Sequence, residues 1–372
     1  MSLELDEHRE YLIDAHRVDA FARGIAAVVK PGDVVVDLGC GTGILGLLAC
    51  RAGAARVYAI DGSGMAAVAD AIGSANGYAD RITVVRGHSL HVSLPERADV
   101  VVGDQTGGFG FEAGIIEYFG DARRRFLKPD GRFVPRRLSL WVAPIERQDV
   151  RNDAAFWSTR PAGFDMSPAQ TIASNSGYPR RVEAADLLAT GCRAATLELG
   201  DENACFSFTA DMTIQRSGVM HGIAGWFTAE MADTIGMTNA PGDPQRINRR
   251  NAIFPIAQPV AVAPGESVRV QMQIRPVDLM VKWVIEHQQD RFEHSTFNGM
   301  LLSPAVLRRT RPEFIPRLSE RGRARKLVLD LADGCTRVAD IERCVLDAYP
   351  QLFAAPADAG RFVAEVVTRY AE

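Results

Sequence analysis

The spacing of hydrophobic residues changes along the chain and separates a first part, residues 1–137, from the remainder of the chain. Short apolar runs, such as 34–36, 55–61 and 98–104, alternate in this part with stretches whose apolar residues recur at helical spacing. The stretch 1–30 reads as one such helix, and further helices follow the apolar runs. Alternating strands and helices of this length predict a parallel sheet with helices on both faces.

From residue 138 the pattern becomes a series of short β-rich runs, which predict an antiparallel barrel or sandwich over residues 138–302. A polar and aromatic segment at about 150–175 interrupts these runs and is expected to be partly helical. From residue 303 to 372 the chain is helical and rich in arginine. Within this last part, 326–334 (KLVLDLADG) reads as a strand, and two helices are expected at 338–352 and 357–370.

Length and charge narrow the class of protein. At about 150 residues per domain, 372 residues predict two or three domains. A net charge of -4 does not favour a nucleic-acid binder. The charged start MSLELDEHRE is not a signal peptide, and no apolar run approaches the ~18 residues of a membrane span. The six cysteines form no CxxC pair, so we expect reduced thiols, a cytoplasmic protein and no metal site.

A glycine-rich turn, DLGCGTG at 37–43, follows the first strand and precedes a helix. Glycines let the backbone approach a ligand closely, and a helix N-terminus favours a negative group. Asp61 ends the second strand, where an acid is placed to bind both hydroxyls of a ribose. The spacing is not GxGxxG, which argues against a dinucleotide. The pattern therefore predicts a nucleotide-like cofactor.

The same turn resembles motif I of the class I S-adenosylmethionine (SAM) methyltransferases, and VVVDLGCGTGILGLLACRAGAARVYAID is similar to the cofactor segment of the protein arginine methyltransferases. EHREYLIDAHRVDAF resembles that family's helix over the cofactor. The resemblance implies a SAM-binding Rossmann-like domain at 1–137, with Arg17 on the methionine carboxylate. The cofactor-binding residues that it implies are Arg17, Asp37, Gly39, Gly41, Gly43, Asp61, His88 and Ser89. AFWSTRPAGFDMS resembles the family's dimerisation arm, which implies a homodimer.

The loop GDQTGGFGFE holds two candidate catalytic carboxylates, Asp104 and Glu112. The family has two glutamates in this loop that hold the substrate guanidinium. Here Asp104 replaces the first, the loop is one residue shorter, and Gly107, Gly108 and Gly110 stand where bulky residues usually pack. We therefore expect an acceptor site with more room. Two carboxylates can orient an amine and accept its proton, and Glu112 is expected to open a helix.

Asn248 and Arg249 replace part of the family's Thr-His-Trp segment and are candidate substrate-binding residues. A positive Arg249 beside the acceptor site would repel a guanidinium. Three functions therefore remain open: methyl transfer to a nitrogen of a peptide or small molecule in a specialised pathway, O-methylation of a carboxylate or hydroxyl, or a binding scaffold with little catalysis. His221 is expected in the core. His287 and His294, seven residues apart as on one helix face, fit no metal pattern.

The C-terminal part resembles the small winged-helix domain of the pyrroloquinoline-quinone peptide chaperone, through its DG turn, its ADIE helix start and its YP ending. The resemblance implies that a leader peptide could be recruited by adding a strand to the edge of a sheet. The alternative is a helical cap on the barrel. The second helix is not basic, which disfavours DNA binding.

Overall fold

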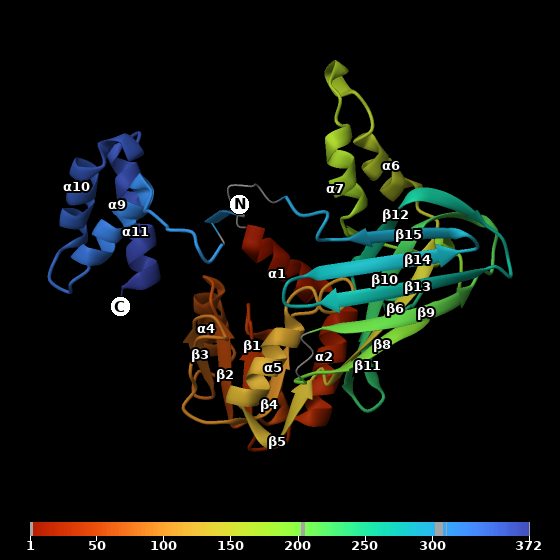
Figure 1. The fold of residues 1–372 in the computed structure, drawn as a ribbon. Helices are drawn as coiled ribbons and strands as arrows, with labels where there is room; N and C mark the ends of the chain where they lie inside the picture. Colours follow the sequence, from red (N-terminus) through yellow and green to blue (C-terminus); the bar gives the residue numbers. More distant parts are fainter. Residues whose placement is uncertain (1–2, 202–204, 302–307, 310, 372) are drawn as a thin grey trace. The chain divides into compact units, whose positions relative to one another are not determined.

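The structure, a computed structural model, describes residues 3–201, 205–301, 308–309 and 311–371. The chain forms two compact units, Met1–Met300 and Leu301–Glu372. The first unit contains a parallel sheet with helices and two antiparallel sheets (Figure 1). No helix in the described part of the chain is long and apolar enough to cross a membrane.

The parallel sheet has the strand order β3-β2-β1-β4-β5. Its strands are β1 (Val34–Leu38), β2 (Arg56–Asp61), β3 (Ile82–Arg86), β4 (Ala98–Gly103) and β5 (Leu127–Val134). Every residue of β1 is buried, because helices cover both faces of the sheet. β1 pairs with β2 on one side and β4 on the other, so the loops after these three strands meet at one edge. In open parallel sheets this edge is where ligands bind.

The helices of this part lie close to the expected positions. They are α1 (Leu3–Ile13), α2 (Ala15–Val28), α3 (Ile44–Ala52), α4 (Met65–Ala75) and α5 (Ile115–Arg125). The single helix expected over 1–30 is wrong in one respect, because Asp14 divides it. The Asp14 carboxylate accepts a hydrogen bond from the backbone N–H of Arg17 (3.2 Å) and so caps α2.

The β-rich part forms two antiparallel sheets. One has the order β7-β12-β10-β6-β8 with β11 on β10, and the other the order β15-β14-β13-β9. Their strands are β6 (Arg137–Ile145), β7 (Tyr178–Arg180), β8 (Cys192–Glu198), β9 (Phe206–Thr213), β10 (Gly218–Ala232), β11 (Ile235–Thr238), β12 (Asn251–Val262), β13 (Ser267–Arg275), β14 (Met280–His287) and β15 (Asp290–Ser295). The antiparallel prediction is confirmed, but among the described residues hydrogen bonds do not close the sheets into a barrel.

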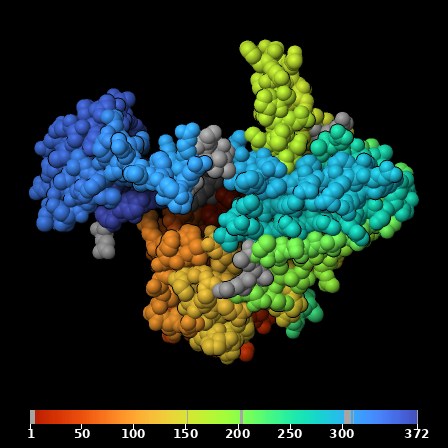
Figure 2. All heavy atoms as spheres, viewed as in Figure 1, coloured from red at the N-terminus to blue at the C-terminus, as the bar shows by residue number. Residues whose placement is uncertain are grey.

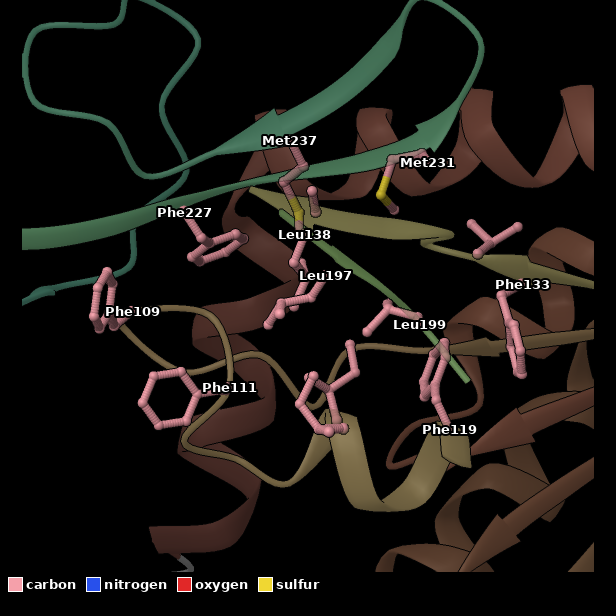
Figure 3. Packing of buried hydrophobic residues seen from close by; sticks show 14 of the residues in the cluster. Phe109, Phe111, Phe119, Phe133, Leu138, Leu197, Leu199, Phe227, Met231 and Met237 are labelled. Atoms are coloured by element: carbon pink, nitrogen blue, oxygen red, sulfur yellow. The ribbon is translucent and has the colours of Figure 1, made fainter. Parts of the chain in front are cut away.

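One hydrophobic cluster joins the parallel sheet to the antiparallel sheets. Phe109 and Phe111, from the loop after β4, are fully buried. Figure 3 shows the Phe109 ring near Phe227 of β10, and Phe111 and Leu138 of β6 belong to the same cluster. The acid-bearing loop is therefore anchored in the core at its centre.

The segment expected to be partly helical forms α6 (Gln148–Phe156), α7 (Gln170–Ser174) and short 3-10 turns at Pro161–Gly163, Ser167–Ala169 and, further on, Ala184–Asp186. α6 and α7 project from the sheets as a narrow arm (Figures 1 and 2). Phe156 and Phe164 on this arm are exposed, with 48% and 69% of their surface accessible. An arm with exposed aromatic rings is suited to contact a partner.

In the second unit, all the regular secondary structure described between residues 311 and 371 is helical. It contains α9 (Glu320–Leu331), α10 (Val338–Ala348), a 3-10 turn (Pro350–Leu352) and α11 (Pro356–Tyr370), with no strand. The strand expected at 326–334 is therefore wrong. Ala324 and Val328, four residues apart on α9, pack instead against α10 and α11 in a core of their own. The winged-helix resemblance is therefore not supported. The described part of this unit has no sheet edge to which a peptide could add a strand.

Candidate functional site

The glycine-rich turn has the backbone shape that its sequence predicts. Gly39, Gly41 and Gly43 have φ angles of 58°, 54° and 77°, in the left-handed region that favours glycine. At Gly41 a Cβ atom would also overlap the ring of His8 from α1. α1 therefore packs directly over the turn, as the resemblance implies.

A cavity of about 230 Å³ opens beside this turn, at the carboxyl edge of the sheet. It is lined by Leu38, Gly39, Ile60, Asp61, Gly62, Ser63, Gly87, His88, Ser89, Gln105 and Tyr118. Four of the predicted cofactor residues therefore meet in one place. Sequence reasoning missed Gln105 and Tyr118. Gln105 follows Asp104 at the end of β4 and could have been found from that position, whereas Tyr118 of α5 carries no motif.

The Asp61 carboxylate holds the turn in shape. It accepts hydrogen bonds from the backbone N–H of Gly41 (2.8 Å) and from the N–H (2.8 Å) and hydroxyl (2.7 Å) of Ser63. Three of the roughly four acceptor positions of a carboxylate are then used. A remaining position beside the cavity fits a hydroxyl donor such as that of a ribose.

Two buried acceptors beside the turn have no donor among the described residues: Asp37 Oδ1 and Gln105 Oε1. The other Asp37 oxygen accepts from the backbone N–H of Gly46 (2.8 Å). Burial, together with the charge of Asp61, raises the pKa of Asp37 to about 7. An unpaired buried acceptor is costly, so these two atoms fit a ligand that brings donors, such as the ammonium group of SAM.

Asp104 lies between two arginines. Its Oδ2 accepts from Arg17 Nε (2.5 Å) and Arg249 Nη2 (3.3 Å), and its Oδ1 accepts from Arg249 Nη1 (3.3 Å) and the Thr106 hydroxyl (2.9 Å). Burial alone would raise the pKa of Asp104, but the guanidinium groups of Arg249 and Arg17 outweigh it and hold the pKa below its usual range. Asp104 is therefore an ionised carboxylate at neutral pH.

The Arg17 side chain is held by contacts outside the cofactor cavity. Besides Asp104, it donates to the backbone carbonyl of Tyr11 (3.2 Å), and its guanidinium packs over the rings of Tyr11 and Phe21. Its side chain is 8% exposed. In this structure Arg17 contacts Asp104 of the acid loop and is not among the residues that line the cofactor cavity.

Glu112 lies in the loop before α5 and does not open the helix as expected, because α5 begins at Ile115. Its carboxylate turns back and accepts from the backbone N–H groups of Phe109 (2.8 Å) and Phe111 (3.1 Å). Burial raises the pKa of Glu112. The two acids therefore differ in character, since the pKa of Asp104 is lowered and that of Glu112 is raised.

The glycines of the acid loop do not make room, which corrects the sequence interpretation. A Cβ atom at Gly107 would overlap the Glu112 carboxylate, and one at Gly108 would lie 2.7 Å from the backbone oxygen of Arg250. These glycines let the loop pack tightly against itself and against the segment before β12. The missing bulk is supplied by Phe109 and Phe111, which are buried in the core.

The two candidate substrate-binding residues face different ways. The backbone N–H of Asn248 donates to Asp14 (2.6 Å), and its side-chain oxygen accepts from Arg181 (3.2 Å), so its side chain does not contact the acids. Arg249 contacts Asp104 directly. The structure thus brings Arg249, but not the Asn248 side chain, to the acid loop.

Comparison with known sequences agrees with this arrangement. The sequence model of the arginine methyltransferase oligomerization subdomain matches residues 136–288, and that of ribosomal protein L11 methyltransferase (PrmA) matches residues 22–135. Protein arginine N-methyltransferase 1 of Dictyostelium discoideum is 31% identical over 234 residues, which are 60% of this chain and 68% of that protein. The chain belongs to the protein arginine N-methyltransferase family.

Membership makes the chain a SAM-dependent methyltransferase. The probable protein arginine N-methyltransferase 6 of Arabidopsis thaliana is 30% identical over 239 residues, and the chain spans about half of that relative (54%). The Trypanosoma brucei PRMT1 enzyme-prozyme heterotetrameric complex with AdoHcy has a similar fold, with a TM-score of 0.70 at 21% identity over 77% of this chain and 96% of that one.

Three histidines of this arginine methyltransferase family member, His221, His287 and His294, lie outside the site. His287 and His294 are on adjacent strands, β14 and β15, rather than on one helix. His287 Nε2 lies 2.9 Å from Glu266 Oε2, and the His294 ring stacks on Trp283 at 5.3 Å. His221 is buried in β10, as expected. Among the described residues, no group of three His, Cys, Asp or Glu side chains could hold a metal ion.

Proposed function

We propose that this chain transfers a methyl group from SAM to a guanidinium nitrogen of arginine in a peptide or protein. One observation carries the proposal: Asp104 already holds a guanidinium, that of Arg249. Asp104 directly follows β4 and precedes Gln105, which lines the cofactor cavity. The names of the relatives, which are protein arginine N-methyltransferases, support the same acceptor.

SAM supplies an electrophilic methyl group when it is bound. The glycine turn, Asp61, His88 and Ser89 are assigned to its adenosine part, and Arg17 to its methionine carboxylate. Asp37 is assigned to the ammonium group, because its Oδ1 has no donor among the described residues. Arg17 uses Nε on Asp104 and Nη1 on the Tyr11 carbonyl, so its other N–H groups are the ones assigned to the cofactor carboxylate.

The two acids then take different roles. Asp104, with its lowered pKa, remains ionised and orients the acceptor guanidinium. Glu112, with its raised pKa, is the better proton acceptor. Bond formation between the acceptor nitrogen and the methyl carbon would break the bond from that carbon to the SAM sulfur, and S-adenosylhomocysteine would be the leaving group. The proton that the nitrogen loses would pass to the Glu112 carboxylate and from there to water.

A second candidate function is O-methylation of an anionic acceptor. It is favoured by one observation, the presence of two guanidinium groups, those of Arg17 and Arg249, on a single Asp104 carboxylate. Cationic side chains in a largely buried site favour a carboxylate ligand.

Transfer of a radiolabelled methyl group separates these functions. We expect label in peptides that contain arginine and none in peptides whose arginines are replaced by lysine. Glu112→Gln should lower kcat about 10²-fold with little change in KM, because a proton acceptor is lost while orientation by Asp104 is kept. Base-labile label in acidic peptides would decide for O-methylation. Absence of transfer to any acceptor would favour a binding scaffold.

We further propose that the arm makes a homodimer. The match to an oligomerization subdomain and the exposed Phe156 and Phe164 support it. Replacing both rings by aspartate should halve the mass measured by light scattering at micromolar concentration. A wild-type monomer under those conditions would contradict the dimer.

A further inference from the structure

We propose that Arg249 is a specificity-determining residue that fills the acceptor subsite with the chain's own guanidinium, so that a substrate guanidinium binds only by displacing it. The inference rests on the proposed function, because it takes Asp104 to be the acceptor-binding acid.

The contacts of Arg249 are those expected of a bound guanidinium ligand. Two of its nitrogens face the two oxygens of Asp104 at 3.3 Å, and Nη1 also donates to the backbone carbonyl of Thr106 (2.6 Å) and to the Thr106 hydroxyl. The guanidinium carbon lies 5.7 Å from the centre of the Tyr11 ring. A carboxylate fork, a carbonyl and an aromatic face together recognise a planar cation.

The pair of Asp104 and Arg249 is largely closed to solvent. The Asp104 side chain is 6% exposed and that of Arg249 is 14% exposed. A substrate guanidinium therefore cannot reach the Asp104 oxygens while Arg249 stays in place. If a substrate guanidinium entered while Arg249 stayed in place, three cations, including Arg17, would share the two carboxylates of Asp104 and Glu112. The repulsion among the cations would oppose binding.

The backbone on either side of Arg249 is fixed, so its guanidinium is held near Asp104. The buried Asn239 side chain donates to the carbonyls of Gly108 (2.7 Å) and Arg250 (3.2 Å) and so joins the acid loop to the arginine segment. Gly108 is needed there, because a Cβ would meet the Arg250 oxygen. On the other side, Asp14 binds the N–H of Asn248 (2.6 Å). A tethered group competes at a high effective concentration.

A tethered competitor weakens every ligand of its subsite by the fraction of time that the subsite is free. If Arg249 leaves Asp104 free about a tenth of the time, the apparent Kd of an arginine substrate is about ten times its intrinsic value. Removing the guanidinium should recover this factor, and the recovery should be specific to ligands with a guanidinium group.

The test is calorimetric titration of the full chain, with S-adenosylhomocysteine present, with an acetylated and amidated Gly-Arg-Gly peptide. We expect Arg249→Gln to bind the peptide about tenfold more tightly than the wild type. Arg249→Lys should gain less, because an ammonium keeps the charge but cannot pair with both oxygens. Arg250→Gln is the matched control: it removes an equal charge from the next, exposed residue and should leave Kd unchanged.

The outcomes separate this inference from the function on which it rests. Equal affinity of Arg249→Gln and wild type, with binding lost in Asp104→Asn, overturns the role of Arg249 and leaves the arginine acceptor intact. Weaker binding by Arg249→Gln, in a variant whose melting curve matches the wild type, also overturns it. If no variant binds the peptide, the role of Arg249 is overturned, and the methyl-transfer assay decides separately whether arginine is an acceptor.

Discussion

Replacing Asp104 by asparagine should lower kcat/KM for methyl transfer by about 10²–10³-fold and the free energy of unfolding by roughly 3 kcal/mol. The amide has nearly the same shape but no charge, so the guanidinium groups of Arg17 and Arg249 remain buried without a counter-ion. Breaking a buried ion pair from one side is costly because the remaining charge stays desolvated. Methyl-transfer kinetics and urea unfolding measure the two effects.

Asp99→Asn is the control for this variant. Asp99 lies near the start of β4, the strand that Asp104 follows. Its carboxylate pairs with Lys128 (2.7 Å) and its side chain is 24% exposed. It should keep full activity and lose less stability. The double variant Asp104→Asn/Arg249→Gln should regain part of the stability but none of the activity, because one buried cation is removed with its partner. If Asp104→Asn kept the stability of the wild type, Arg17 and Arg249 would not need Asp104 as their counter-ion.

The gathering of candidate cofactor residues at one cavity could be predicted because it follows from local features of the sequence. A buried strand, a glycine turn and a helix are local features, and Asp61 follows at the end of the next strand. Gly39, Asp61, His88 and Ser89 accordingly line one cavity. The left-handed backbone of the turn also follows from glycine's conformational freedom.

The proposed acceptor half of the site could not be predicted in the same way, since it depends on contacts between distant segments. Asp104 and Arg249 are 145 positions apart, and charge alone indicated repulsion of a substrate rather than pairing with an acid. The glycines of the acid loop suggested open space, whereas their role is close backbone approach to the segment before β12. Only the fold shows which of these meanings a glycine has.

The strand expected at 326–334 failed for a related reason. KLVLDLADG is a short run rich in apolar residues that ends in a DG turn, which favours a strand when read locally. The preceding residues extend the same segment into a helix that begins at the Ser319 cap, where the serine hydroxyl accepts from the N–H of Gly322 (3.1 Å). Packing of Val328 against Ile341 and Phe362 then favours the helix over the local preference.

Replacing Asp37 by asparagine should remove a pH dependence of stability between about pH 4 and pH 7. The folded-state pKa of Asp37, about 7, lies above the ordinary value of 3.8, so the folded protein binds this proton more tightly than the unfolded chain does. The stability that comes from this proton is fully present below pH 3.8 and is lost as the pH rises through 7. The unfolding free energy of Asp37→Asn, minus that of the wild type, should therefore increase with pH, with a limiting slope of about 1.4 kcal/mol per pH unit, and level off above about pH 8.

Asp99→Asn provides the contrast in this measurement as well. Burial opposes ionisation of Asp99, but Lys128 outweighs it and lowers the pKa, so the contribution of Asp99 is lost as the pH falls through its folded-state pKa, below 3.8. Its difference curve should be flat above about pH 5.

If the SAM ammonium pairs with Asp37, saturating SAM should favour the ionised form and flatten the wild-type curve near pH 7. A curve for Asp37→Asn that parallels the wild type without cofactor would show that Asp37 is already ionised in the folded protein, and the ammonium would then not be needed to stabilise it.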